Sequence, residues 1–199
     1  MNLPNKISLS RILMIPFFLV AFFLEGVLPY NYMIAAIIFT VAACTDFVDG
    51  YIARSRNLVT NIGKFLDAIA DKVLVATAMI VVLTMKDTLF TVFGEWANLA
   101  YIITCVGICI ILAREFLVSA FRQIAAANGI VIAAEKLGKY KAACQDVALV
   151  CLIFAADFAN LFGTIVAFVG FGLFAVAIVL TVLSGIGYIM KNKQVLKED

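Results

Sequence analysis

The sequence predicts an all-α, polytopic membrane protein with six transmembrane helices, and three observations support that fold class. The 199-residue chain is 65% hydrophobic and only 14% charged, against about 45–50% and about 25% in soluble domains. Its mean hydropathy is +1.10. A chain this short cannot bury so much apolar surface in one water-soluble core. We therefore expect residues 1–199 to form a single integral membrane domain in contact with lipid.

Six apolar windows are long enough to cross a bilayer, which requires about 20 mainly apolar residues. They cover residues 8–24, 32–53, 64–85, 98–121, 141–157 and 163–190. The breaks between them are predicted at Pro29, Lys86-Asp87, Asn128-Gly129 and Gly163. The first window is interpreted as a retained helix, because its apolar run is too long for a signal peptide and no small-residue cleavage site follows it.

The basic residues predict the orientation of these spans. If the N-terminus is cytoplasmic, every lysine and arginine except Lys86 falls on the cytoplasmic side, including those of the 54–64 and 122–140 connections. Lysine and arginine are enriched on that side of membrane proteins. Both termini are therefore predicted to be cytoplasmic, and a bacterial cell membrane is the expected location.

The sequence contains no histidine, so a general acid or base must be a carboxylate, lysine, tyrosine or cysteine. The five cysteines lie in apolar stretches without paired spacing, which argues against zinc or disulfide chemistry. They are interpreted as small buried hydrophobic residues. No nucleic-acid partner is expected.

Four aspartates lie at the predicted cytoplasmic ends of the second and third spans. Asp46 and Asp49 are three residues apart, and Asp67 and Asp71 are four apart, so each pair shares a helical face. Four carboxylates at low dielectric cannot all ionise unaided, whereas one or two divalent cations would neutralise them. Oxygen ligands without histidine or thiolate favour Mg²⁺, with Mn²⁺ or Ca²⁺ as alternatives.

The residues beside these acids suggest a phosphate ester as the ligand. Gly50 and Gly63 permit close approach to the backbone, and Arg54 can bind a phosphate through two N–H groups. Two ions about 4 Å apart would hold the attacking and leaving oxygens of a phosphoryl displacement. The alternative is that the acids only pair with Lys64, Lys72 and Arg54. Four acids on two facing helices make that interpretation the weaker one.

Residues 46–71 resemble the signature of the CDP-alcohol phosphatidyltransferase family. The signature reads D-x2-D-G-x2-A-R-x8-G-x3-D-x3-D, and every fixed position matches this sequence. The resemblance implies metal-assisted direct transfer of a phosphatidyl group from CDP-diacylglycerol to a small alcohol, with CMP released. It also implies two Mg²⁺ ions and a homodimer.

The resemblance assigns roles residue by residue. The metal-binding positions are Asp46, Asp49, Asp67 and Asp71, of which Asp71 is also the general base. The positions that hold the cytidine and its diphosphate are Asp49, Gly50, Ala53, Arg54 and Gly63. Three further residues match positions that contact the nucleotide in some members, namely Thr60 after the motif arginine, and Asn5 and Ser8 before the first span.

The later spans favour a phosphorylated acceptor, since choline would instead prefer an aromatic cage. Their cytoplasmic ends carry Arg114, Arg122, Lys136, Lys139 and Lys141. The segments PNKISLSRILMIPFF, AREF and LGKYKAACQ also resemble bacterial family members that use glycerol 3-phosphate, which would give phosphatidylglycerophosphate. We expect Arg114, Lys139 and Lys141 to bind the acceptor phosphate, with Arg122 and Lys136 behind them.

Several alternatives stay open. The acceptor could be phosphatidylglycerol or inositol phosphate, and juxtamembrane cations often serve topology and anionic headgroups instead. The Arg114–Glu115 pair could be structural. A cation transporter is disfavoured, because its site would lie near the midplane on broken helices. A scaffold without catalysis would tolerate Asp67→Asn or Asp71→Asn.

Overall fold

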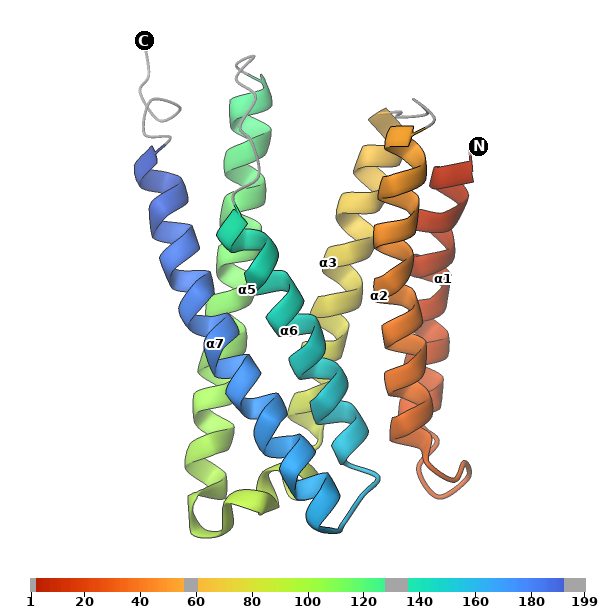
Figure 1. The fold of residues 1–199 in the computed structure, drawn as a ribbon, viewed down its shortest axis with the longest axis vertical. Helices are drawn as coiled ribbons and strands as arrows, with labels where there is room; N and C mark the ends of the chain where they lie inside the picture. Colours follow the sequence, from red (N-terminus) through yellow and green to blue (C-terminus); the bar gives the residue numbers. More distant parts are fainter. Residues whose placement is uncertain (1–2, 56–60, 128–135, 192–199) are drawn as a thin grey trace.

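The described part of the chain forms six long helices, with two short helical segments between the third and the next (Figure 1). The computed structural model describes residues 3–55, 61–127 and 136–191, without the side chains of residues 3–7, 46–55, 61–62, 64–68, 126–127, 136 and 189. The elements are α1 (Leu3–Phe23), α2 (Asn31–Ser55), α3 (Asn61–Thr84), α4 (Lys86–Leu89), the 3₁₀ segment η1 (Phe90–Trp96), α5 (Ala97–Ala127), α6 (Lys136–Ala155) and α7 (Leu161–Lys191). Over the ranges just given the protein is all-α, as predicted.

The long helices run alternately up and down, so that the start of α1 and the end of α7 lie at the same end of the molecule (Figure 1). We call this the N/C end. The opposite end, called the turn end, consists of residues 24–30, α4 with η1, and residues 156–160. Within the described residues, two helical stretches are long and apolar enough to cross a membrane, Lys86–Ala125 and Leu161–Tyr188.

Aromatic and small residues pack the helices together. Phe18 on α1 contacts Phe39 on α2, with ring centroids 6.0 Å apart, and both side chains are fully buried. On α7, a Cβ added to Gly170 would lie 2.9 Å from the Leu152 side chain of α6, so the glycine permits close helix contact. The outer surface exposes large apolar side chains, such as Phe17, Val106 and Val179, as expected of helices that face lipid.

One predicted boundary was wrong. Gly163 does not separate two spans, because it is the third residue of α7 and its N–H donates to Asn160 Oδ1. The break lies at residues 156–160, where Asn160 caps the new helix. A Cβ at Gly163 would lie 1.8 Å from the Phe158 carbonyl oxygen. The glycine is therefore needed because the backbone of the preceding turn packs directly against it. At the other end of the chain, α1 begins at Leu3, so Asn5 and Ser8 lie within this helix.

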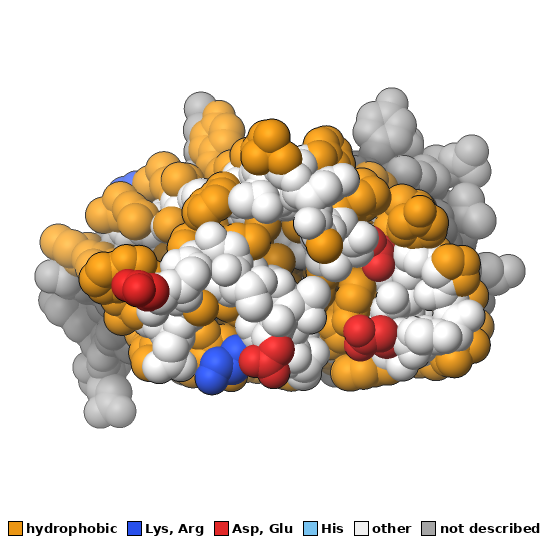
Figure 2. All heavy atoms as spheres, turned by 90° about the horizontal axis from the view of Figure 1, so that it is seen from below, with side chains coloured by type: hydrophobic (Ala, Val, Ile, Leu, Met, Phe, Trp, Pro, Cys, Tyr) orange, Lys and Arg blue, Asp and Glu red, His pale blue; other side chains and the backbone are white. Residues whose placement is uncertain are grey.

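Charge differs between the two ends. The turn-end segments carry the acids Glu25, Asp87, Glu95 and Asp157, and their one base is Lys86. Figure 2 views this end and shows acidic groups scattered among hydrophobic and uncharged ones. The lysines and arginines of the long helices all lie in the helix halves nearer the N/C end. The basic residues are thus concentrated toward the N/C end, whereas acidic residues occur at both ends of the long axis.

Candidate active site

The helices α2 and α3 bring the four aspartates to corresponding levels. Asp46 and Asp49 lie in the half of α2 nearer the N/C end, and Asp67 and Asp71 lie in the matching half of α3, which packs against α2. Asp49 lies six residues before the end of α2, and Asp67 lies six residues after the start of α3. The two pairs are therefore at similar depth on neighbouring helices.

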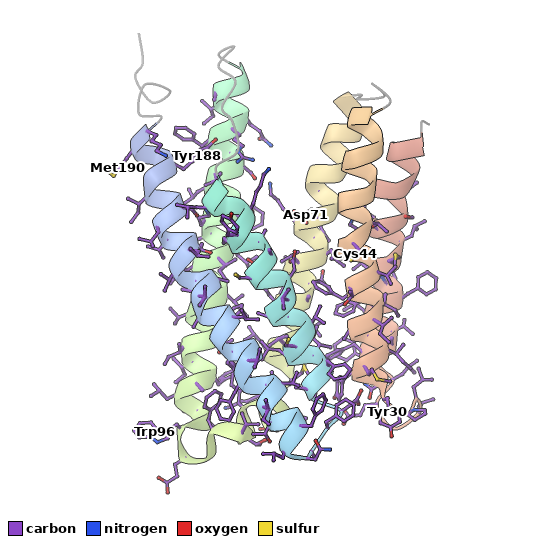
Figure 3. All side chains as sticks on the ribbon, in the orientation of Figure 1. Tyr30, Cys44, Asp71, Trp96, Tyr188 and Met190 are labelled. Carbon is purple, nitrogen blue, oxygen red and sulfur yellow. The ribbon has the colours of Figure 1, made fainter. Side chains whose placement is uncertain are left out.

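Asp71 lines a cavity of about 260 Å³ between α3, α5, α6 and α7. The cavity lies toward the N/C end, where Figure 3 labels Asp71 on α3 and Tyr188 on α7. Five basic side chains line it against three acidic ones, an excess that favours an anionic ligand. The bases are Lys72, Arg114, Arg122, Lys139 and Lys141, and the acids are Asp71, Glu115 and Asp146.

Arg114 is held by contacts from three helices. Its Nη1 donates to Glu115 Oε1 at 3.1 Å, and its Nη2 donates to Ser184 Oγ on α7 at 3.0 Å. Two glycines make room for it: a Cβ on Gly185 would lie 3.1 Å from Arg114 Cγ, and one on Gly138 would lie 4.0 Å from Nη2. The guanidinium is thus fixed in the cavity wall, with its side chain 17% exposed.

Three other cations also have protein partners. Lys141 Nζ donates to Glu115 Oε1 at 2.9 Å, so one carboxylate oxygen accepts from both Lys141 and Arg114. Arg122 Nε donates to Tyr188 OH at 3.2 Å, and its guanidinium lies 5.5 Å from the centre of the same ring. Lys72 on α3 donates to Ser119 Oγ on α5. These bonds connect the helices that surround the cavity.

The structure gathers only part of the set predicted from the sequence. It brings Asp71, Arg114, Arg122, Lys139 and Lys141 to one cavity, and it places Ser8 in α1, buried to 3% exposure. Gly63 lies in the first turn of α3. Several residues fall outside what the structure describes: Thr60, and the side chains of Asn5, Asp46, Asp49, Ala53, Arg54, Asp67 and Lys136. Gly50 is placed only as part of α2.

Two partners of the cavity's arginines were not predicted from the sequence: Ser184, which accepts from Arg114, and Tyr188, which accepts from Arg122 and lines the cavity. Both lie on α7, four residues apart, in a helix that is otherwise almost entirely apolar. That spacing puts them on one face, and polar residues inside an apolar helix usually face a partner helix. This pattern would have indicated that α7 lies beside the basic residues of α5.

Comparison with known proteins places these features in a family. A model of the CDP-alcohol phosphatidyltransferases matches residues 1–189. The chain is 38% identical to a CDP-diacylglycerol–glycerol-3-phosphate 3-phosphatidyltransferase of Bacillus subtilis (strain 168), over 98% of this chain and 97% of the relative. Proteins of the same name from Rickettsia bellii and Salmonella typhimurium are 36% and 37% identical, over 97% and 94% of this chain and 96% and 93% of the relatives.

Proposed function

This chain belongs to the CDP-alcohol phosphatidyltransferase family, and we propose that it transfers the phosphatidyl group of CDP-diacylglycerol to glycerol 3-phosphate. The products would be phosphatidylglycerophosphate and CMP. The family membership makes the protein a phosphatidyltransferase. The names of its bacterial relatives support glycerol 3-phosphate as the acceptor.

One structural observation supports glycerol 3-phosphate as the acceptor. The cavity that contains Asp71 also contains Arg114, Arg122, Lys139 and Lys141. An acceptor hydroxyl must approach a base, and a phosphorylated acceptor must also place its phosphate on cations. A cavity of about 260 Å³ suits a molecule of the size of glycerol 3-phosphate.

We further propose that Asp46, Asp49, Asp67 and Asp71 would hold two Mg²⁺ ions, with Mn²⁺ as an alternative. The fit rests on donor chemistry and on the matching levels of the pairs on α2 and α3, since carboxylate oxygens are the ligands that these hard cations prefer. When bound, the ions would neutralise negative charge on the phosphates that react.

Each residue at the site then has a proposed role in the transfer. Asp71 accepts the proton of the acceptor hydroxyl. The oxygen of that hydroxyl forms a bond to the phosphorus attached to diacylglycerol, and the anhydride bond from that phosphorus to CMP breaks, so that CMP carries away the electron pair. Arg114, Lys139 and Lys141 bind the acceptor phosphate and orient the hydroxyl, and Arg122 and Lys136 reinforce the positive charge behind them.

The donor would lie on the α1, α2 and α3 side of the site. Asp49, Gly50, Ala53, Arg54 and Gly63 would bind the cytidine and diphosphate of CDP-diacylglycerol, as the family signature implies. Thr60, Asn5 and Ser8 would add contacts to the nucleotide. Charge from the leaving phosphate would be balanced by Arg54.

The positions of the basic residues also suggest how the protein lies in the membrane. We propose that α1, α2, α3, α5, α6 and α7 each cross the cell membrane, with the N/C end in the cytoplasm and residues 1–199 forming one catalytic domain. The segregation of basic residues toward the N/C end supports this orientation. A homodimer is proposed from the family resemblance.

An acceptor panel tests the proposed function. The purified protein, in detergent with CDP-diacylglycerol, would be offered glycerol 3-phosphate, phosphatidylglycerol, inositol phosphate or no acceptor, and CMP release and the lipid product would be measured. We expect a phosphatidyl product with glycerol 3-phosphate alone. A chelator should abolish the reaction, and Mg²⁺ or Mn²⁺ should restore it.

The panel separates the alternatives. A faster reaction with phosphatidylglycerol or inositol phosphate would keep the chemistry and reject the acceptor. A protein that releases no CMP with any acceptor, in the presence of Mg²⁺, would be inconsistent with the transferase assignment. That result would favour a cation transporter or a scaffold without catalysis.

A further inference from the structure

Gln145 is a buried polar residue in the wall of the cavity. It lies on α6 and is 3% exposed. Among the described residues, its Oε1 atom has no hydrogen-bond partner. An unpaired buried acceptor carries the full desolvation cost of the group, and most such atoms in folded proteins are paired. A hydrogen-bond donor on a ligand in the cavity would satisfy it.

The position of Gln145 relative to the cations restricts that donor. Gln145 follows Lys141 by four residues, so both lie on the face of α6 that lines the cavity. Since α6 runs from the N/C half of the molecule toward the turn end (Figure 1), Gln145 lies one turn deeper than Lys141. A ligand whose phosphate contacts Lys139 and Lys141 would bring its carbon chain to Gln145 when that chain points into the cavity toward the turn end.

The chemistry of glycerol 3-phosphate leaves one group for this contact. Its phosphate accepts hydrogen bonds and cannot satisfy Oε1 when ionised. Of its two hydroxyls, we assign the primary one, which is less hindered, as the nucleophile that Asp71 deprotonates. The secondary hydroxyl is left, and it can donate. It would suit either orientation of the amide, because a hydroxyl both donates and accepts.

We propose that Gln145 binds the secondary hydroxyl of glycerol 3-phosphate and thereby determines acceptor specificity. This inference rests on the proposed function, since it requires glycerol 3-phosphate in the cavity. A site built to hydrogen-bond a hydroxyl discriminates against an analogue that lacks it, because the buried polar group is then left unpaired.

The test compares glycerol 3-phosphate with 3-hydroxypropyl phosphate, which keeps the primary hydroxyl and the phosphate but lacks the secondary hydroxyl. The measured quantity is the ratio of kcat/KM for the two acceptors. We expect wild type to prefer glycerol 3-phosphate and Gln145→Leu to reduce that preference by about tenfold. The loss should come from a higher KM for glycerol 3-phosphate, with the analogue little affected. Gln123→Leu, an exposed glutamine on α5 outside the cavity lining, is the matched control and should retain the preference.

The folded state provides a second measurement. Because Oε1 is unpaired, replacing Gln145 by an apolar side chain should leave the thermal unfolding midpoint unchanged or raise it. Gln145→Met, which keeps the unbranched shape, would replace the leucine variant if the latter misfolds. An equal loss of kcat/KM for both acceptors, or an unchanged ratio, would overturn the proposal. Wild type that uses neither acceptor would instead reject the proposed function.

Discussion

Lys141 on α6 donates a 2.9 Å hydrogen bond to Glu115 on α5, and this ion pair joins two walls of the candidate site. The side chain of Lys141 is 4% exposed and that of Glu115 is 28% exposed. A lysine that is almost completely buried requires a counter-charge. Glu115 therefore has a structural role at the site, beside the phosphate-binding role proposed for Lys141.

Removing the charge of Glu115 should destabilise the protein. We expect Glu115→Gln to cost about 1–3 kcal/mol, less than the 3–5 kcal/mol typical of a fully buried pair, because Glu115 is partly exposed. The measurement is the thermal unfolding midpoint in detergent. The double variant Glu115→Gln/Lys141→Met should recover part of the loss, and Glu95→Gln at the turn end should show none. A single variant as stable as wild type would contradict this role for Glu115.

Replacing Asp71 should remove turnover without unfolding the protein. We expect Asp71→Asn to lower kcat by about 10²–10⁴-fold, because an amide cannot accept the acceptor's proton. Asp87→Asn provides the control, since Asp87 is exposed on α4 at the opposite end. CMP release measures both. Near-normal activity in a folded Asp71→Asn protein would reject Asp71 as the base.

Two glycines of α7 allow a matched test of Arg114. A Cβ on Gly185 would lie 3.1 Å from Arg114 Cγ, so Gly185→Ala requires the arginine to move by a few tenths of an ångström. We expect the KM for glycerol 3-phosphate to rise by roughly 3- to 10-fold, less than the roughly 100-fold effect of a 1 Å displacement, with the KM for CDP-diacylglycerol unchanged.

The control for that change is Gly187→Ala. Nothing lies within 4 Å of a Cβ at Gly187, and alanine favours a helix by about 0.5–1 kcal/mol over glycine. Its kinetics should match wild type. If both variants shift the acceptor KM equally, the effect belongs to α7 as a whole and not to Arg114.

Asp157 should stabilise the turn end through the start of α2. Its Oδ2 accepts a 2.6 Å hydrogen bond from the Met33 N–H, which lies in the first turn of α2 and has no partner within that helix. We expect Asp157→Ala to cost about 0.5–2 kcal/mol and Asp157→Asn, which keeps an acceptor oxygen, to cost less. Thermal unfolding would rank the two. Equal losses would show that the acceptor oxygen is not what matters.

The pH dependence of the same residue has a defined sign. Burial raises the pKa of Asp157, although hydrogen bonds from Met33 and Tyr32 oppose the shift. The contribution of this group is therefore fully present below its ordinary pKa and is lost as pH rises through the raised one. Wild type should lose stability relative to Asp157→Asn over that interval. A gap that is constant with pH would contradict the shift.

The helices were predictable because each apolar window is at least as long as the shortest membrane spans. All six windows lie largely within α1, α2, α3, α5, α6 and α7. The boundary near Gly163 failed for a local reason: composition marks a glycine as a breaker, but here Asn160 caps the helix and the glycine accommodates the Phe158 carbonyl. Such a contact depends on tertiary structure that residue types do not reveal.

Part of the candidate site could be proposed from the sequence, where residues recur at a fixed spacing. The four aspartates follow from the motif, and the basic residues follow from their number at the ends of spans. The partners of those bases did not follow, since Ser184 and Tyr188 are about 70 residues away from Arg114 and Arg122 in the sequence. The unpaired oxygen of Gln145 could not be predicted either. From the sequence alone, Gln145 is equally consistent with a residue that supports the site and with a polar residue that packs between helices.

The charge segregation described above has a consequence for biogenesis. In the proposed orientation, only the turn-end segments must be translocated across the membrane, and they carry Lys86 as their one cation. Lysine and arginine are the residues that resist translocation, whereas acidic residues contribute little. The pairs α1–α2, α3–α5 and α6–α7 are thus suited to insertion as helical hairpins. Lys86, 4.9 Å from the centre of the Tyr101 ring, is the one positive charge that has to be carried through.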